Sequence, residues 1–175
     1  MKLFHKSVEK RVNVFLKGME IVWAENFAFK DEMAALGTKY KPAMEHVSSF
    51  AEYVDTAKQD VYILPLTKNL LQQQCDKLTK MFMDNTPLFM ELVTKVIPKI
   101  DETIGYLDKV TKTLQKLSDN RNSVEYSERV MAKFEESLAK YQKQNTIIRK
   151  RLDAISAGFE EMEKYYQSLK SSPDR

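Results

Sequence analysis

The sequence predicts an all-α protein: an elongated antiparallel bundle, or coiled coil, of three long helices plus an N-terminal amphipathic helix. Apolar residues recur at helical spacing along most of the chain. Gly and Pro are scarce, with four and five among 175 residues, which argues against a β-rich or loop-rich fold. Hydrophobic residues make up 43% of the chain and charged residues 30%, so the composition is that of a folded protein with a core.

The last helix, expected from Val124 to Leu169, has the clearest pattern. Its spacing of alternately three and four residues selects one apolar seam: Met131, Phe134, Leu138, Tyr141, Asn145, Ile148, Leu152, Ile155, Phe159, Met162, Tyr166 and Leu169. This 3.5-residue period is typical of a left-handed supercoil, and such a helix would be roughly 70 Å long. A compact domain of this size has a radius of gyration of only about 16 Å, so we expect an elongated protein. Asn145 is predicted to set the register against a facing helix, and Gly158 to cost about 1 kcal/mol relative to Ala.

The N-terminal segment, residues 1–36, is predicted to form an amphipathic helix. One face is apolar: Phe4, Val8, Val12, Phe15, Met19, Val22 and Trp23. Another face is polar and basic: Lys2, Lys6, Lys10, Asn13 and Lys17. Such a helix can lie in a membrane interface, but the same spacing also fits a core helix with a solvated lysine face. The sequence leaves both interpretations open.

The second helix is expected from Pro42 to Met83. Gly37 and Pro42 predict a break or kink before it, because Pro lacks a backbone N–H and clashes with the preceding turn. Within this helix Pro65 is expected to disturb the period.

Residues 84–87 (Asp-Asn-Thr-Pro) predict a stop and restart, with Pro87 in the first turn of a third helix. The third helix continues the apolar pattern: Phe89, Val93, Val96, Ile100, Leu107, Val110, Leu114 and Leu117. Pro98 is expected to bend it. Residues 118–123 are predicted to form the turn that leads into the last helix.

The positive charge is concentrated at the N-terminus. The formal net charge is +3, yet residues 1–18 hold five cations against the single carboxylate of Glu9, so the rest of the chain is slightly negative. We therefore expect no nucleic-acid binding. The single Cys75 excludes an intramolecular disulfide and fits a reducing compartment. No apolar run approaches the ~20 residues of a membrane span and no signal peptide is evident, which favours a cytoplasmic protein.

Catalytic and metal-binding motifs are absent from the sequence. The two histidines, His5 and His46, belong to no zinc or di-iron motif. The four glycines are scattered, so no phosphate-binding loop is expected. Cys75 lies in an apolar helical setting typical of a buried, inert thiol, and Asp55 and Asp60 match no calcium loop. We therefore expect no enzyme, no cofactor and no metal site.

A second set of cations, beyond the N-terminal segment, is a candidate surface for anionic partners: Lys109, Lys112, Lys116, Arg121, Arg129, Lys133, Lys140 and Lys143. Residues 139–151 contain five cations and no acid. The alternative is a solvated surface in which these cations pair with nearby carboxylates: Glu125, Glu128, Glu135 and Glu136.

Three stretches resemble the BAR (Bin/amphiphysin/Rvs) domains, and in particular the N-BAR type of amphiphysin-like proteins. Residues 3–17 (LFHKSVEKRVNVFLK) are similar to the amphipathic "helix zero" of that family. Residues 116–129, with KLSDNR followed by VEYSER, are similar to its pattern of a basic residue, an acidic-Tyr pair and an Arg. Residues 131–142 and 159–164 resemble its last helix.

The resemblance implies a crescent-shaped homodimer that binds anionic phospholipid membranes and senses or induces their curvature, as a cytoplasmic, peripheral membrane protein in endocytosis or trafficking. Residues 1–22 would be the N-terminal helix, 23–171 the BAR-like domain and 172–175 a disordered tail. The N-terminal lipid-binding residues would be Lys2, Leu3, Phe4, Lys6, Val8, Lys10, Arg11, Val12 and Lys17. A homodimer is also expected because the apolar seam looks longer than one chain can cover.

The rival interpretation is a helical protein–protein interaction module, spectrin-like or a four-helix bundle, without membrane activity. In that case residues 1–36 are a core helix, so residues 1–20 would be strongly protected from hydrogen exchange. Rapid exchange of the same residues would favour a membrane-inserting helix.

Overall fold

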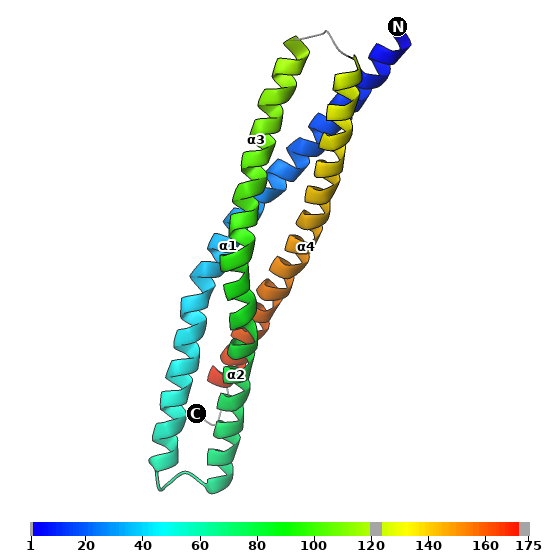
Figure 1. The fold of residues 1–175 in the computed structure, drawn as a ribbon. Coiled ribbons are helices and arrows are strands. Elements are labelled where there is room, and N and C mark those ends of the chain that lie inside the picture. Colours follow the sequence, from blue (N-terminus) through cyan, green and yellow to red (C-terminus); the bar gives the residue numbers. More distant parts are fainter. Residues whose placement is uncertain (1, 120–123, 172–175) are drawn as a thin grey trace. The chain divides into compact units, whose positions relative to one another are not determined.

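The computed structural model describes residues 2–119 and 124–171, with side chains described for residues 10–114 and 128–171. The elements are α1 (Lys2–Gln59), α2 (Pro65–Glu91), a π-helix η1 (Leu92–Val96), α3 (Ile97–Asp119) and α4 (Val124–Lys170). Figure 1 labels the α-helices. Throughout these ranges the chain forms no strand. The all-α fold class is confirmed.

Helix α1 continues through Gly37 and Pro42, so the predicted break there is wrong. It is a single helix of 58 residues, and its first part is the N-terminal segment that the sequence suggested as a separate element. Leu36 and Ala43, on either side of the proline, are both buried. Burial of an apolar face over many turns outweighs the roughly 3 kcal/mol that an interior proline costs a helix.

Helix α1 ends instead at Gln59, and residues 60–64, which were predicted to lie inside a helix, form a turn. The backbone N–H of Asp60 donates to the carbonyl of Ala57 (3.2 Å), and that of Ile63 donates to the carbonyl of Asp60 (3.4 Å). Pro65 is the first residue of α2. At that position its missing N–H has no intrahelical partner to lose, so Pro65 starts a helix and does not disturb one.

Helix α2 continues through residues 84–87, so the predicted stop and restart is wrong as well. Phe82, Asn85 and Phe89 are buried on one side of this helix. The hydroxyl of Thr86 donates to the carbonyl of Phe82 (2.9 Å). Pro87 is therefore accommodated inside α2, as Pro42 is inside α1.

The chain passes from α2 into α3 through a π-helix, Leu92–Val96. This element directly precedes the turn that contains Pro98. A proline cannot donate to the carbonyl four residues earlier, and a local π-turn changes the hydrogen-bond register at that point. The bend expected at Pro98 stays a prediction, and the structure shows a π-helix that ends two residues before this proline.

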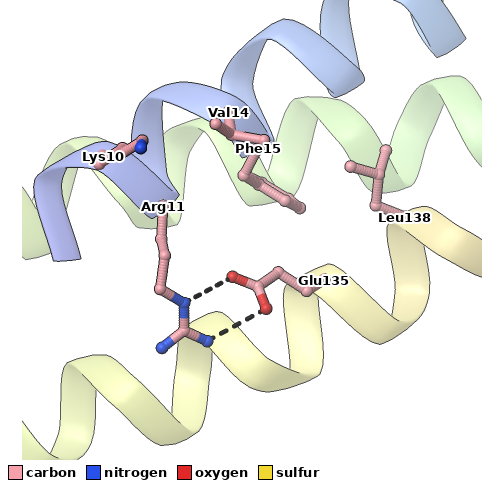
Figure 2. A pocket seen from close by; sticks show the side chains of 6 residues that line it. All are labelled: Lys10, Arg11, Val14, Phe15, Glu135 and Leu138. Atoms are coloured by element: carbon pink, nitrogen blue, oxygen red, sulfur yellow. Dashed lines mark hydrogen bonds and ion pairs between the residues drawn. The ribbon is translucent and has the colours of Figure 1, made fainter. Parts of the chain in front are cut away.

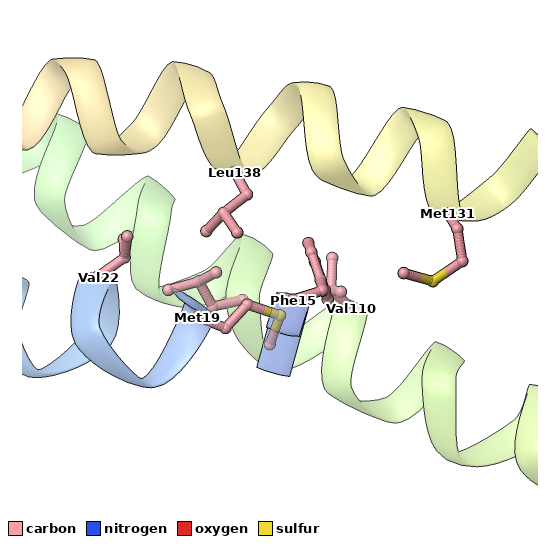
Figure 3. Packing of buried hydrophobic residues seen from close by; sticks show 7 residues of the cluster. Phe15, Met19, Val22, Val110, Met131 and Leu138 are labelled. Atoms are coloured by element: carbon pink, nitrogen blue, oxygen red, sulfur yellow. The ribbon is translucent and has the colours of Figure 1, made fainter. Parts of the chain in front are cut away.

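The chain divides into two compact units. Unit 1 contains residues 1–31 and 94–150, which include the first part of α1, all of α3 and the first part of α4. A buried apolar cluster forms its core: Phe15, Met19, Val22, Leu107, Val110, Met131 and Leu138. Figure 3 shows these side chains converging from the three helices. The N-terminal part of α1 is thus a core helix of unit 1 from Phe15 onward.

Unit 2 contains residues 32–93 and 151–175, that is, the second part of α1, α2 and the last part of α4. Aromatic rings pack at its centre. The ring of Tyr40 stacks on Phe89 (centroids 4.9 Å apart), lies 5.4 Å from Phe82, and meets the edge of Phe159 at 6.4 Å. Tyr40 therefore joins α1 to both α2 and α4 in this unit.

The predicted seam of α4 is buried. Ten of its twelve positions are buried, and Phe134 and Tyr141 are partly buried. Each part of the seam packs inside its own unit, so the argument that it needs a second chain to cover it is wrong. The homodimer remains a prediction without that support.

Asn145 faces a helix, as predicted, and that helix is α1 of the same chain. Its exposed fraction is 1% and that of Asn26 is 0%. The Asn26 amide donates to Oδ1 of Asn145 (3.2 Å) and to the carbonyl of Val22 (2.7 Å). The Asn145 amide donates to Oε2 of Glu25 (3.1 Å). These bonds define the register of α1 against α4 in unit 1.

Candidate functional site

The N-terminal candidates divide into residues that face the core and residues that face solvent. Val12 is partly buried against the core of unit 1, while Lys10 and Lys17 are exposed. The backbone of the remaining candidates is part of α1, but their side chains lie outside the described part: Lys2, Leu3, Phe4, Lys6 and Val8. From Val12 to Val22 the apolar face of this segment contacts protein, whereas Trp23 is exposed.

Arg11 is paired with a carboxylate of α4. Its Nε donates to Oε1 of Glu135 (2.9 Å) and its Nη2 donates to Oε2 (3.1 Å), the bidentate geometry shown in Figure 2. Hydrogen bonding and charge from Glu135 raise the pKa of Arg11. The pair borders an open groove of about 430 Å³ between α1 and α4. Because Glu135 neutralises Arg11, this residue is a poor candidate for binding lipid phosphates.

The α3 candidates do not form a purely cationic surface. Lys109 and Lys112 are exposed, but Nζ of Lys112 lies 2.9 Å from Oδ2 of Asp108. The side chain of Lys116 and all of Arg121 lie outside the described residues. Of the two α3 candidates whose side chains are described, Lys109 is thus the one that forms no ion pair with another described residue.

The α4 candidates lie on one face of the helix. Arg129, Lys133, Lys140 and Lys143 are all exposed, and Lys150 is exposed at the next position of the same row. Their separations of four, seven, three and seven residues place them on a common side at 3.6 residues per turn, opposite the buried Leu138 and Asn145. We call these five residues the cationic face of α4.

One carboxylate, Glu136, lies within the cationic face. Among the residues whose side chains are described, none of the five cations forms an ion pair. The sequence identified four of the five; Lys150 was missed as a site residue because it stands between two arginines. The spacing of Lys150 from Lys143 was the signal that would have found it.

The two neighbouring arginines contact side chains of other helices. The guanidinium of Arg149 lies 4.9 Å from the centre of the Phe29 ring. In unit 2, Nη1 of Arg151 donates to Oε1 of Glu91 (3.3 Å). The cation-rich stretch 139–151 therefore contributes three lysines to the cationic face and two arginines to internal contacts.

Cys75 is buried and His46 is partly buried. Cys75 has an exposed fraction of 8%, and desolvation raises the pKa of its thiol. Nε2 of His46 lies 2.9 Å from Oε2 of Glu163, and its ring stacks on Tyr166 with centroids 3.9 Å apart. In the described part of the chain, no group of three or more His, Cys, Asp or Glu side chains is placed to hold a metal ion.

Comparison with protein-family models, curated proteins and solved structures found no match for this chain. Among the described helices, none has a stretch that is long and apolar enough to cross a membrane. The distribution of charged and apolar side chains over the surfaces of the two units is therefore the basis for the proposals below.

Proposed function

We propose that this protein binds anionic phospholipid membranes through the cationic face of α4. The observation that supports the proposal is the row of five exposed cations at helical spacing with one carboxylate among them. A lysine or arginine near an anionic leaflet contributes about 1 kcal/mol, so five of them suffice for binding that weakens with salt. We further propose that the chain forms a BAR-like homodimer that senses or induces membrane curvature.

The N-terminal segment has a smaller part in this proposal than its sequence suggested. Lys10 and Lys17 are two turns apart on one side of α1, with the exposed Val14 and Ile21 on the same side. These residues are available to a membrane surface. The buried Phe15, in contrast, can insert only if α1 leaves the core of unit 1. Insertion of Leu3, Phe4 and Val8 remains part of the proposal.

Charge reversal on the cationic face tests the proposal. We expect Lys140→Glu/Lys143→Glu/Lys150→Glu to weaken co-sedimentation with phosphatidylcholine–phosphatidylserine vesicles by at least about tenfold, since three favourable contributions become unfavourable. The matched control, Lys39→Glu/Lys99→Glu/Lys164→Glu, makes the same change in net charge at exposed positions elsewhere. We expect this control to retain most of the binding.

Equal losses in the two triple variants would contradict the assignment to α4, because binding would then follow net charge alone. Absence of binding by the unmodified chain at low salt would overturn the membrane function. Binding that stays equally strong when the salt is raised to about 0.5 M, where the Debye length is ~4 Å, would contradict its electrostatic basis.

A helical interaction module without membrane activity is the second candidate, and one observation favours it. α1 packs in the core from Phe15 onward, as that interpretation required. The same helix exposes an apolar row, with Leu16, Trp23 and Phe27 exposed by 36%, 50% and 48%. The Trp23 and Phe27 rings lie 5.8 Å apart. A helix from another chain, including a second copy of this one, would find an apolar contact surface there.

The single tryptophan makes this row directly observable. If a homodimer uses it, we expect Trp23 emission to shift to shorter wavelength as protein concentration rises, in parallel with a doubling of mass in light scattering. Trp23→Ser/Phe27→Ser should then be monomeric, with mass as its readout. A monomeric unmodified chain at all concentrations would contradict the homodimer.

A further inference from the structure

The turn between α1 and α2 exposes an unusual number of apolar side chains. Val61, Tyr62, Leu64 and Leu66 have exposed fractions of 84%, 93%, 70% and 80%. They belong to six consecutive residues, 61–66, which we call the α1–α2 tip. Turns normally present Gly, Pro, Asn, Asp or Ser, whose backbone preferences or short hydrogen-bonding side chains suit a turn. Four apolar side chains exposed together indicate a binding surface.

Part of the backbone of the tip is hydrogen-bonded within the protein. Oδ1 of Asp60 accepts the N–H of Tyr62 (2.9 Å), and the Asp60 carbonyl accepts the N–H of Ile63 (3.4 Å). The Leu64 carbonyl accepts the N–H of Lys68 (3.0 Å), and Pro65 has no N–H. These bonds order the turn, and insertion to the level of the headgroups leaves its remaining amides and carbonyls in contact with water.

We propose that the α1–α2 tip inserts into the interfacial zone of a lipid bilayer, an inference that rests on the proposed membrane function. The tip lies at the end of the α1–α2 hairpin (Figure 1). Neighbouring side chains of a turn point in different directions, so a partner protein would cover only some of these four. A bilayer surrounds a convex tip on all sides. Tyr62 has the apolar ring and polar hydroxyl that suit the level of the headgroups.

The charged residues next to the tip are compatible with its insertion into a bilayer. Lys58 is exposed at the end of α1, and Nζ of Lys68 at the start of α2 donates to the carbonyl of Lys58 (2.7 Å). Both ammonium groups would lie near the headgroups when the tip is inserted. The one carboxylate of the turn, Asp60, is engaged by the backbone of Tyr62. Since apolar side chains dominate, the contribution of the tip is hydrophobic and resists salt, unlike that of the cationic face of α4.

A fluorescent probe at the tip tests the insertion. The full chain with Cys75→Ala and Leu64→Cys is labelled with the environment-sensitive dye NBD and mixed with phosphatidylcholine–phosphatidylserine vesicles. We expect the emission to increase and to shift to shorter wavelength, and a quencher within the acyl chains to reduce it. The matched control carries the label at Lys41→Cys, whose side chain is 78% exposed on α1 of the same unit. Its emission should not change.

A second variant separates this inference from the proposed function. Val61→Ser/Leu64→Ser/Leu66→Ser should reduce binding measured at about 0.5 M salt by at least about tenfold, because each exposed apolar side chain adds to partitioning. The substituted positions are exposed, so helical circular dichroism should be unchanged.

Three other outcomes are decisive. Vesicle binding without any change of the NBD signal overturns the tip insertion and leaves the cationic face of α4 intact. A tip signal combined with unchanged binding of the α4 charge-reversal variant overturns the cationic face and leaves the tip. If the NBD signal changes with protein concentration in the absence of vesicles, the tip contacts another protein chain and the inference is wrong.

Discussion

Gly158→Val is expected to destabilise the protein by about 2–3 kcal/mol, as overpacking of a close-packed interior does. In unit 2, any Cβ at position 158 would overlap the side-chain amide of Asn85 on α2. Asn85 has an exposed fraction of only 6%, so its side chain has little room to move away. From the sequence, Gly158 looked like a small loss of helix propensity. In the structure it permits the close approach of α4 and α2.

Chemical denaturation of matched variants separates the low helix propensity of this glycine from the space that it leaves for Asn85. Gly37→Ala and Gly105→Ala place a Cβ where, apart from the adjacent residues and the helix's own backbone, no atom lies within 4 Å, so they should stabilise the protein by up to about 1 kcal/mol. Gly158→Ala should lose that gain, and the added substitution Asn85→Ala should restore it by removing the overlap. If Gly158→Val is as stable as the unmodified chain, the close approach of α2 and α4 is wrong.

Asn145→Ala is expected to lower the free energy of unfolding by about 1–3 kcal/mol, the cost of leaving buried polar groups without partners. The substitution removes the acceptor of the Asn26 amide and a donor to Glu25, at a position with an exposed fraction of 1%. Because Asn26 lies wholly in the interior of unit 1, water cannot readily replace the lost bond.

A variant in which both asparagines are replaced provides the control for this pair. Replacing both residues, Asn26→Leu/Asn145→Leu, removes the polar groups together and should cost less than Asn145→Ala alone. The two asparagines would then contribute mainly to register, and the double variant should show a less uniquely packed α1–α4 interface in the near-ultraviolet circular dichroism. An Asn145→Ala variant with unchanged stability would contradict the buried hydrogen bonds.

Two prolines show why a local signal does not by itself decide where a helix ends. Pro42 and Pro65 carry the same local signal, yet the first lies inside α1 and the second begins α2. A local signal reports only the intrinsic cost of a proline in a helix. Whether the helix continues depends on the apolar surface that the flanking turns bury, and that surface is supplied by other helices.

The cations of residues 139–151 also differ in ways that the local sequence does not reveal. The sequence identified a cation-rich stretch at 139–151 but could not sort its members. Arg149 contacts Phe29 and Arg151 contacts Glu91, whereas Lys150 between them faces solvent. These contact partners are distant in sequence, so the spacing of residues along α4 does not reveal them.

The sequence by itself determined that the chain is helical, which face of α4 is buried, and that Asn145 meets another helix. These features follow from the periodicity of side chains along one helix, which is a local property. Only the tertiary structure decided that α1 covers α4 in unit 1, that Gly158 is required against Asn85, and that the turn at 61–66 exposes its apolar residues. These depend on which surfaces meet across long separations in the chain, and packing at those contacts outweighs local preference.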